Sequence, residues 1–435
     1  RWLSAGAAAA LRIKACESGK SRGLQLPVGW RMRYHSKRNK HHFYGPLFMI
    51  RISLVLLLAF SVFGVQAATI VPSPPQIAAK AYLLIDADSG AVLAEKGADM
   101  PLPPASLTKM MTSYVLATEI NEGRVANSDM VAVSENAWSQ NPKFAGSSLM
   151  WIEPGKDVSI EDLQRGIIIS SGNDATVAVA EHLAGSEAVF AEMMNTHAEK
   201  LGMVDSYYVN SHGLPHPDHV TTARDLATLS KAMIDEHPEQ YAIYKEREFT
   251  YNNIKQYNRN SLLAEDPTVD GLKTGYTQEA GYCLVASAER RGMRLISVVM
   301  GTTSANARKN QTRSLLNYGF RFFETSTLFE AGQELDKPRI WKGQADYVPV
   351  GILEETVLTL PRGKKKHLAT NVEMDQNIEA PIALGDALGT VTMTLDGETV
   401  FRGPVVALQA VEPGGFFARL WDMVLMWIAS LFSTG

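Results

Sequence analysis

Three short polar motifs, in a fixed order, constrain this chain more than any other feature of its sequence. Ser106 and Lys109 form an S-x-x-K pair at the opening of an apolar run, and Ser171-Gly172-Asn173 and Lys273-Thr274-Gly275 follow much further along. Each fragment occurs often by chance, but the ordered trio does not. A fold that brings the three together has the parts of a serine acyltransferase, an enzyme that opens an amide or lactam carbonyl.

The S-x-x-K pair has a simple chemical interpretation. Residues i and i+3 of a helix share one face, with their Cβ atoms about 5–6 Å apart. A serine hydroxyl needs a base within hydrogen-bond reach, and a lysine held against an apolar core can lose its proton because desolvation disfavours the ammonium form. Read alone, the pair would be a helix-capping serine and a surface lysine. With the other motifs present, Ser106 is predicted to be the nucleophile and Lys109 its base.

The other two motifs add groups for proton transfer and binding. Ser171-Gly172-Asn173 lies between an apolar run and an alanine-rich helix, where a turn can present a hydroxyl and an amide. Lys273-Thr274-Gly275 precedes the apolar strand predicted at Gly281–Glu289; it offers a charge for a carboxylate, a hydroxyl donor and room for a substrate backbone. As isolated fragments, the first would be a helix-capping turn and the second a solvated turn.

Together these motifs resemble a known family. The chain is similar to the low-molecular-mass penicillin-binding proteins of the 5/6 type, which are serine-type D-alanyl-D-alanine carboxypeptidases of the bacterial cell wall. Asn141–Ser148, Asn210–Leu214 and Met293–Gly301 are similar to that family as well. The resemblance covers roughly residues 70 to 435 and includes the C-terminal tail.

The resemblance implies a role for each site residue. Ser106 corresponds to the acylated nucleophile, Lys109 to the proton acceptor, Ser171 and Asn173 to the second motif, Lys273, Thr274 and Gly275 to the substrate-binding motif, and Arg308 to an arginine for the terminal carboxylate. Some relatives have His where this chain has Tyr276, which leaves only a backbone N–H for an oxyanion hole there. The implied reaction removes the terminal D-alanine of peptidoglycan pentapeptide without a metal or organic cofactor, and β-lactams would inhibit it covalently.

The N-terminal 68 residues read as segments outside the folded protein. Residues 1–48 are rich in Arg, Lys and His and are interpreted as an over-extended or non-native segment. Residues 49–68 have a basic start, a short apolar run and a small-residue end at Ala67-Ala68, the pattern of a secretory signal peptide. The alternative is a basic nucleic-acid-binding arm or a transit peptide. The signal interpretation predicts a periplasmic protein.

Charge and cysteine content exclude several functions once this segment is set aside. Residues 1–68 hold eleven of the 42 Lys and Arg side chains and one of the 46 Asp and Glu side chains, so residues 69–435 carry a formal net charge of −14. Such an acidic chain is not predicted to bind nucleic acid. Cys283 is the remaining cysteine and is expected to be buried. His212, His216, His219 and Asp218 are interpreted as a polar loop beside the cleft rather than a metal site.

The pattern of periodicity predicts two domains and a tail. Residues 69–327 mix helical and strand-like segments and are expected to form an α/β (α+β) domain like those of β-lactamases and transpeptidases. It begins with a hairpin at Ala81–Ala94 and has late strands at Gly281–Glu289 and Arg294–Met300 that close a sheet. Residues 328–412 are predicted to form a small all-β domain, with turns at Asp396-Gly397 and Arg402-Gly403-Pro404. Lys364-Lys365-Lys366-His367 is interpreted as a solvated loop.

Residues 413–435 are predicted to be an amphipathic helix that binds a membrane surface. From Phe416 to Phe432 the periodicity is helical, with Arg419 and Asp422 on a narrow polar stripe and Trp421 and Trp427 among the apolar residues. The segment is short for a spanning helix and contains two charges. A true span and packing on the protein's own core are the alternatives. The prediction places the enzyme at the outer face of the inner membrane.

Three other functions remain open from the sequence. A D,D-endopeptidase that cuts peptidoglycan cross-links shares the motifs, although such relatives usually lack the second domain. A class A β-lactamase shares the serine chemistry but fits the S-G-N triplet, the β domain and the tail poorly. A non-catalytic wall-binding scaffold is disfavoured by the intact motifs.

Overall fold

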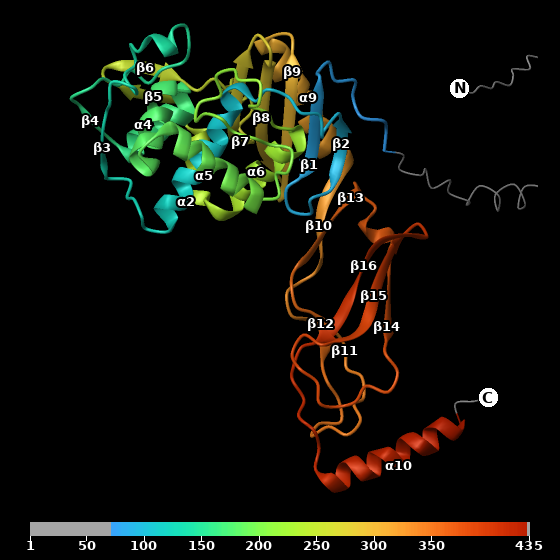
Figure 1. Cartoon of the computed structure of the whole chain (residues 1–435). Coiled ribbons are helices and arrows are strands. Elements are labelled where there is room, and N and C mark those ends of the chain that lie inside the picture. The colour runs from blue at the N-terminus through green and yellow to red at the C-terminus, as the bar shows by residue number, and fades with distance from the viewer. Residues whose placement is uncertain (1–70, 433–435) are drawn as a thin grey trace, which may run out of the picture. The chain divides into compact units, whose positions relative to one another are not determined.

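The computed structural model describes residues 71–432, and their side chains as far as residue 428. The predictions for residues 1–68 lie outside this range. Figure 1 shows a helical and sheet-containing part that is followed by a β-rich part and a final helix. The mixed fold class predicted from the sequence is confirmed.

The elements divide between the two parts at the end of α9. The helices and 3-10 or π segments are η1 Ala105–Thr108, α2 Lys109–Asn121, η2 Pro142–Phe144, α3 Ile160–Arg165, η3 Gly166–Ser170, α4 Asn173–Ala184, α5 Glu187–Lys200, α6 Ala223–Glu236, α7 Pro238–Tyr241, η4 Ala242–Lys245, α8 Leu262–Glu265, α9 Ala305–Phe322, η5 Lys365–His367 and α10 Phe416–Phe432. The strands are β1 Ala81–Asp86, β2 Val92–Lys96, β3 Met130–Ala132, β4 Asp157–Ser159, β5 Glu248–Tyr251, β6 Ile254–Tyr257, β7 Val269–Thr277, β8 Gly281–Arg290, β9 Met293–Thr302, β10 Phe323–Phe329, β11 Gln333–Asp336, β12 Val350–Ile352, β13 Thr356–Pro361, β14 Leu368–Met374, β15 Ala387–Leu395 and β16 Glu398–Ala407.

A five-stranded antiparallel sheet, in the order β2-β1-β9-β8-β7, supports the first part. Every residue of β1 is buried because both faces of the sheet are covered. Leu83 and Val298 face one core, which also contains residues of α2 and α6, whereas Leu84 and Val299 face a second core with residues of α9. The predicted hairpin and late strands are present. However, β8 and β9 lie inside the sheet, and the edge strand beside the site is β7.

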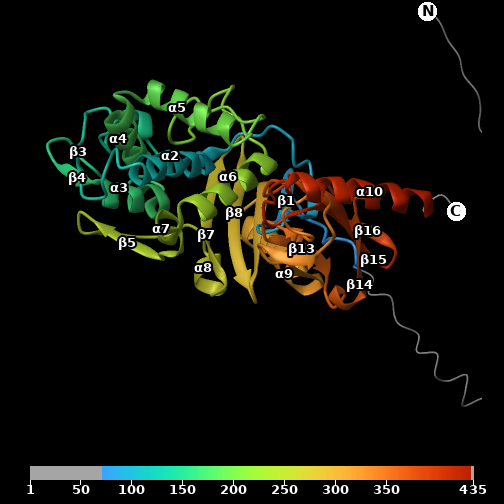
Figure 2. The same ribbon diagram turned by 90° about the horizontal axis from the view of Figure 1, so that it is seen from below.

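Helix α2 is the central element of the helical half (Figure 2), and it is buried on nearly all sides from Lys109 to Ala117. Its surroundings explain why its sequence is apolar all round rather than amphipathic. Several other helices of the first part begin at a serine or threonine whose side chain accepts a backbone N–H from the first turn, as sequence preferences for N-caps predict. These capping residues are Ser159, Ser186, Thr222 and Ser304.

The second part contains the sheet β11-β12-β16-β15-β14 around its own apolar core, and a ribbon of β10 and β13. The predicted turn at Asp396-Gly397 joins β15 and β16, with positive φ at both residues. The predicted turn at Arg402–Pro404 is wrong, because these residues lie inside β16. β12 pairs with β16 only at Val406 and Ala407, so Pro404 has no strand on that side to which it would need to donate an N–H.

The junction between the two parts is a strand rather than a loop. β10 follows α9 directly, so the predicted boundary between residues 327 and 328 falls within this strand. The Asp86 carboxylate at the end of β1 is fully buried, and its Oδ2 accepts hydrogen bonds from the hydroxyls of Thr325 in β10 and, at 2.8 Å, of Thr359 in β13. Asp86 Oδ1 accepts the backbone N–H groups of Asp88 and Ser89, so both oxygens of this buried carboxylate have hydrogen-bond partners.

The C-terminal helix α10 spans Phe416–Phe432, the range that the periodicity predicts. Within the part of the chain that the structure describes, no helix has the length and apolar character needed to cross a bilayer.

Candidate active site

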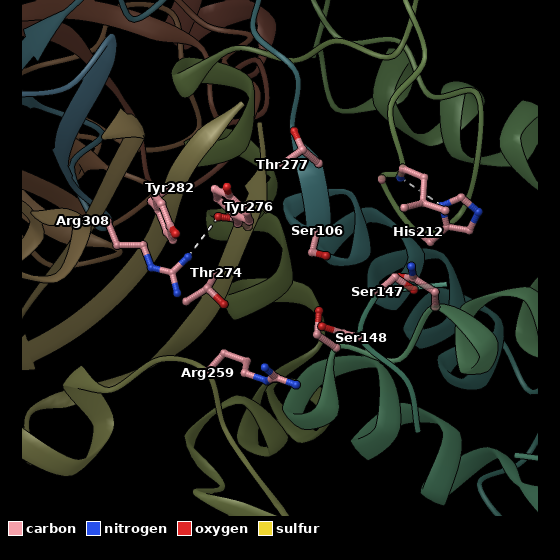
Figure 3. Close-up of a pocket in the computed structure, with 16 residues that line it drawn as sticks. Ser106, Ser147, Ser148, His212, Arg259, Thr274, Tyr276, Thr277, Tyr282 and Arg308 are labelled. Carbon is pink, nitrogen blue, oxygen red and sulfur yellow. Dashed lines mark hydrogen bonds between the residues drawn. The ribbon is translucent and has the colours of Figure 1, made fainter. Parts of the chain in front are cut away.

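The three motifs meet at one cavity of about 300 Å³, lined by parts of η1, α4, β7, β8 and α9 and by residues of the loops between elements. Figure 3 shows Ser106 between Thr274 on one side and Ser147 and His212 on the other. The residues that line the cavity are Ser106, Gly146, Ser147, Ser148, Ser171, Asn173, His212, Gly213, Leu214, Arg259, Thr274, Gly275, Tyr276, Thr277, Tyr282 and Arg308. Lys109 and Lys273 stand behind this wall.

Ser106 lies in the short 3-10 segment η1, and Lys109 is the first residue of α2. The i,i+3 spacing brings Lys109 Nζ to 3.2 Å from Ser106 Oγ, as the sequence predicts. Ser106 is partly exposed to the cavity, whereas Lys109 is fully buried. The pair therefore combines an accessible hydroxyl with an amine that is shielded from water.

The other two partners of Lys109 determine how its amine can act. Nζ lies 2.6 Å from Asn173 Oδ1 and 2.7 Å from the carbonyl oxygen of His212, and both atoms can only accept hydrogen bonds. A neutral amine has two hydrogens and one lone pair. The two acceptors take both hydrogens, so the lone pair is directed to the remaining partner, the hydroxyl of Ser106.

Burial of Lys109 also favours the neutral form of its amine. Desolvation lowers the pKa of Lys109 to about 7, although the nearby Asp174 and Glu187 carboxylates act in the opposite direction. Near neutral pH a large fraction of Lys109 is therefore unprotonated. This is the protonation state that a general base for Ser106 needs.

A second buried lysine pairs with the second motif. Lys273 Nζ on β7 donates to Ser171 Oγ at 2.9 Å and to the carbonyl oxygen of Thr274 at 3.1 Å. Ser171 follows the π segment η3 and has a left-handed backbone, with φ 59°. Burial lowers the pKa of Lys273 well below its ordinary value, and the charges of Lys109, Arg259 and Arg308 add to this effect. Lys273 therefore lies against the serine of the second motif and is not exposed to the cavity.

Asn173 begins α4 and connects two parts of the site. Its Oδ1 is occupied by Lys109, so the amide NH₂ remains as a donor toward the cavity that Asn173 lines. The next residue, Asp174, is buried and accepts the backbone N–H groups of Met150, Trp151 and Ile152 at 2.8 to 3.2 Å. These bonds hold the end of the 146–152 loop, which includes the lining residues Ser147 and Ser148, against α4.

The K-T-G motif lies on the edge strand β7 itself, and its glycine serves packing. A Cβ at Gly275 would lie 3.0 Å from the carbonyl oxygen of Pro104 and 3.2 Å from Leu107, so the missing side chain lets β7 approach η1 closely. The sequence analysis instead predicted that Gly275 leaves room for the backbone of a substrate. Gly213 is similar, because a Cβ there would clash with the carbonyl oxygen of Ala105.

Arg308, in the first turn of α9, borders the cavity on the side of β7 and β8. Its Nη1 donates to the carbonyl oxygens of Gly275 at 3.0 Å and Cys283 at 3.4 Å, and its guanidinium lies 5.6 Å from the ring centre of Tyr282. Tyr276 stacks on Tyr282 with ring centres 4.1 Å apart and is half exposed. Cys283 itself is buried, as predicted.

His212 and Arg259 are among the cavity residues that were missed or only partly identified from the sequence. His212, predicted in a polar loop, is buried; its carbonyl oxygen holds Lys109, and its Nε2 lies 3.2 Å from Glu187. Desolvation and the charge of Lys109 lower its pKa to about 2. Arg259 lines the cavity and had no recognisable motif. Among the described residues no group of His, Cys, Asp and Glu side chains has the arrangement of a metal site.

Comparisons with known proteins agree with this geometry. A family model described as D-alanyl-D-alanine carboxypeptidase matches residues 68–304, and one described as the C-terminal domain of penicillin-binding protein 5 matches residues 323–413. The chain is 45% identical over 366 residues to D-alanyl-D-alanine carboxypeptidase DacC of Escherichia coli K12, which covers 82% of this chain and 92% of that protein.

Solved structures give the same result. Penicillin-binding protein 5 from Haemophilus influenzae superposes with a TM-score of 0.76 at 42% identity, covering 78% of this chain and 99% of that one. Penicillin-binding protein D2 from Listeria monocytogenes, in its cefotaxime-bound form, gives a TM-score of 0.53 at 32% identity and covers 57% and 100%. The chain therefore belongs to the serine-type D-alanyl-D-alanine carboxypeptidases related to penicillin-binding proteins 5 and 6, which confirms the resemblance inferred from its motifs.

Proposed function

We propose that Ser106 carries the acyl group in the family's reaction, the removal of the terminal D-alanine from peptidoglycan pentapeptide. The observation that supports this assignment best is the set of contacts around Lys109 Nζ: two obligate acceptors and one hydroxyl, on a fully buried amine. In this arrangement Lys109 takes the proton of Ser106 as Oγ forms a bond to the carbonyl carbon between the two D-alanines.

The tetrahedral oxyanion is assigned to backbone N–H groups of Ser106 and Tyr276. β7 is an edge strand, so some of its backbone groups lack a strand partner and are open to the cavity side. Fixed donors of this kind stabilise the charge that develops in the transition state. Asn173 Nδ2 is a further donor for a substrate carbonyl.

Breakdown of the intermediate needs a proton on the departing amine. The C–N bond breaks as D-alanine leaves, and we assign to Ser171, whose hydroxyl is hydrogen-bonded to Lys273, the relay of a proton to the departing nitrogen. The relayed proton is the one that Lys109 took from Ser106, so Lys109 becomes neutral again. Water then attacks the Ser106 ester, with Lys109 again taking a proton. A β-lactam follows the same acylation path, but its leaving group stays tethered.

Recognition of the substrate's terminal carboxylate is assigned to Thr274 and Arg308. Both line the cavity, whereas Lys273 is turned to Ser171. Lys273 would thus act on the carboxylate through its hydrogen bond to Ser171 rather than by direct contact. This refines the role that the motif alone suggested.

Covalent labelling tests the assignment. Incubation with penicillin should add one adduct to the peptide that contains Ser106, and Ser106→Ala should abolish both the adduct and the release of D-alanine. Mass spectrometry of pentapeptide and of cross-linked muropeptide products separates carboxypeptidase from endopeptidase action. Labelling that persists in Ser106→Ala, or cleavage of cross-links alone, would contradict the proposal.

We also propose that α10 holds the enzyme on the outer face of the inner membrane. Asp422 points to the β domain, where its Oδ2 accepts the backbone N–H of Lys342 at 2.6 Å. Large apolar side chains of the helix are exposed: Phe416, Phe417, Leu420, Trp421, Met423, Val424 and Ile428. This pattern supports a helix that lies in the interface rather than one that covers the protein's own core.

Truncation after Pro413 tests the anchor. The shortened protein should appear in the soluble periplasmic fraction and still cleave soluble pentapeptide, because the cavity has no residue from α10. If the truncated protein stayed in the membrane fraction after confirmed removal of the signal peptide, the anchor would lie elsewhere.

A further inference from the structure

A second cavity, far from Ser106, is lined mainly by arginines. It has a volume of about 430 Å³ and is bordered by Arg290, Arg291, Asn317, Phe320, Arg321 and Arg362. We call it the arginine pocket. Four guanidinium groups at one place are unexpected in a chain whose residues 69–435 carry a net charge of −14. Neighbouring cations repel one another, so such a cluster favours an anionic ligand.

Two of the arginines form a fixed frame. Arg290 pairs with Asp266 at 2.6 Å, donates to Thr268 and lies 4.5 Å from the ring centre of Phe320. Arg362 donates to the carbonyl oxygens of Phe320 and Phe323, each at 2.7 Å. The carboxylate nearest to it is that of Glu324, at the longer distance of 3.8 Å. These contacts hold two guanidinium groups in place before any ligand arrives, which lowers the entropy lost on binding.

The other two arginines supply the charge that is not neutralised. Arg291 and Arg321 are exposed, and neither has a carboxylate partner among the described residues. Lys365 and Lys366, which are also exposed and have no carboxylate partner in the described chain, follow Arg362 within about 14 Å of chain. The basic run interpreted as a solvated loop thus extends the positive surface beside the pocket.

The backbone at Arg291 gives independent support for a function. Arg291 and Gly292 form the two-residue turn between β8 and β9, with φ values of 57° and 74°. Such a turn needs positive φ at both positions, and Asn-Gly is the sequence it strongly prefers. Arginine adopts this conformation only at a conformational cost. A residue kept in a strained position is more readily explained by a task of its side chain than by folding.

We propose that the arginine pocket is a second binding site for peptidoglycan, one that takes a carboxylate of a stem peptide other than the one being cleaved. This rests on the function proposed above. A stem peptide whose terminus is not cross-linked ends in a carboxylate before and after the reaction, so the polymer repeats the anion that guanidinium groups bind in bidentate fashion. Tyr282, the second residue of β8, lines the active-site cavity, and Arg290 at the end of the same strand lines the arginine pocket, so roughly 27 Å of strand separates the two sites.

An anionic lipid surface is the alternative partner for the arginine pocket, and the structure disfavours it. No exposed large apolar side chain lines the arginine pocket, whereas a surface that enters a bilayer combines cations with such side chains. In this protein, exposed large apolar side chains of that kind gather on α10.

Binding to insoluble purified peptidoglycan, measured by co-sedimentation at low salt, tests the proposal. Ser106→Ala prevents turnover, and the pocket variant adds Arg291→Asn and Arg321→Gln. Arg291→Asn gives the turn its preferred residue, so the melting temperature should not fall. The dissociation constant should rise about tenfold, and raising the salt concentration should weaken the parent protein more than the pocket variant. The control, Lys200→Gln with Lys245→Gln, removes two exposed charges elsewhere and should change binding less than twofold.

Two further arms identify the ligand. Peptidoglycan whose carboxylates have been amidated should bind the parent protein as weakly as native peptidoglycan binds the pocket variant. With Ser106 intact, the pocket variant should lose kcat/KM on polymeric strands but not on a short soluble peptide that ends in D-Ala-D-Ala. Equal binding by parent and pocket variant would overturn the proposal, as would loss of binding only to vesicles of anionic phospholipid. Failure of Ser106 labelling would instead contradict the active-site proposal, because co-sedimentation needs no turnover.

Discussion

The two cavities of this protein use cationic side chains in opposite ways. Near Ser106, Lys109 and Lys273 lie behind the residues that line the cavity. Both are almost fully buried, and burial lowers the pKa of both. In the arginine pocket the cations face solvent, and Arg291 and Arg321 are exposed. Desolvation favours the neutral amine in the first pair, whereas the second pair consists of guanidinium groups, which carry a permanent charge.

The difference also explains which basic residue is found in which place. A lysine amine can be deprotonated near neutral pH when it is buried, but a guanidinium cannot, so general-base chemistry requires lysine. Recognition of carboxylates profits from the planar, permanently charged guanidinium. Arg308 has an intermediate position, since it is partly buried, lines the active-site cavity and has a permanently charged guanidinium for binding.

The largest expected effect comes from exchanging the two types of cation at the base. Lys109→Arg keeps a positive charge but cannot accept the serine proton, so acylation by penicillin should slow about a hundred- to ten-thousandfold. Lys109→Met, which has no charge and a similar length, should slow it equally. Stopped-flow or gel-based acylation rates measure this, with melting temperatures to establish that both variants fold. Near-normal acylation by Lys109→Arg would mean that the amine acts only through its charge.

Removal of the charge at Arg308 should have the next largest effect. A hydrogen bond to a charged group contributes about 1.5–3 kcal/mol, so Arg308→Gln should lower kcat/KM roughly ten- to a hundredfold on peptides with a free terminal carboxylate. Peptides with an amidated terminus should lose much less. Equal losses on both substrates would show that Arg308 supports the sheet through Gly275 and Cys283 instead of binding the substrate.

The sequence predicted those parts of the site that depend on local spacing. Ser106 and Lys109 are three residues apart, and helical geometry alone brings them together. The contact of Lys273 with Ser171 joins residues 102 positions apart and depends on how β7 lies beside the turn between η3 and α4, which no local pattern encodes. For the same reason the carbonyl oxygen of His212, a backbone atom, had no sequence signal as a partner of Lys109.

The fold shows the same limit. Hairpin β1–β2 and helix α10 were predicted because periodicity and turn residues act within the segment itself. Arg402-Gly403-Pro404 has the residues of a turn, yet it lies in β16. A proline is tolerated there because β12 is too short to pair along this stretch, and the length of a neighbouring strand cannot be read from β16 alone.

The pH profile should separate the two cavities by a smaller factor. The pKa of Lys109 is lowered to about 7, so its neutral form predominates above that pH and is lost below it. Acylation should therefore fall about tenfold from pH 8 to pH 6. Binding of peptidoglycan to the arginine pocket should hardly change over this interval, because guanidinium groups stay protonated and carboxylates stay ionised. A parallel fall in both measurements would point to a general loss of structure rather than to titration of Lys109.

The smallest expected effect comes from the reverse substitution, arginine to lysine, in the arginine pocket. Arg291→Lys with Arg321→Lys keeps both exposed charges of the arginine pocket and loses only the planar, bidentate geometry. Because these two side chains are solvated and Arg290 and Arg362 still frame the pocket, binding to peptidoglycan should weaken only about two- to threefold. Co-sedimentation beside the Arg291→Asn, Arg321→Gln protein measures the difference. A loss as large as that caused by charge removal would mean that geometry, not charge, dominates in the pocket. An exchange between lysine and arginine would then be severe in both cavities, at Lys109 and in the arginine pocket, and would no longer distinguish them.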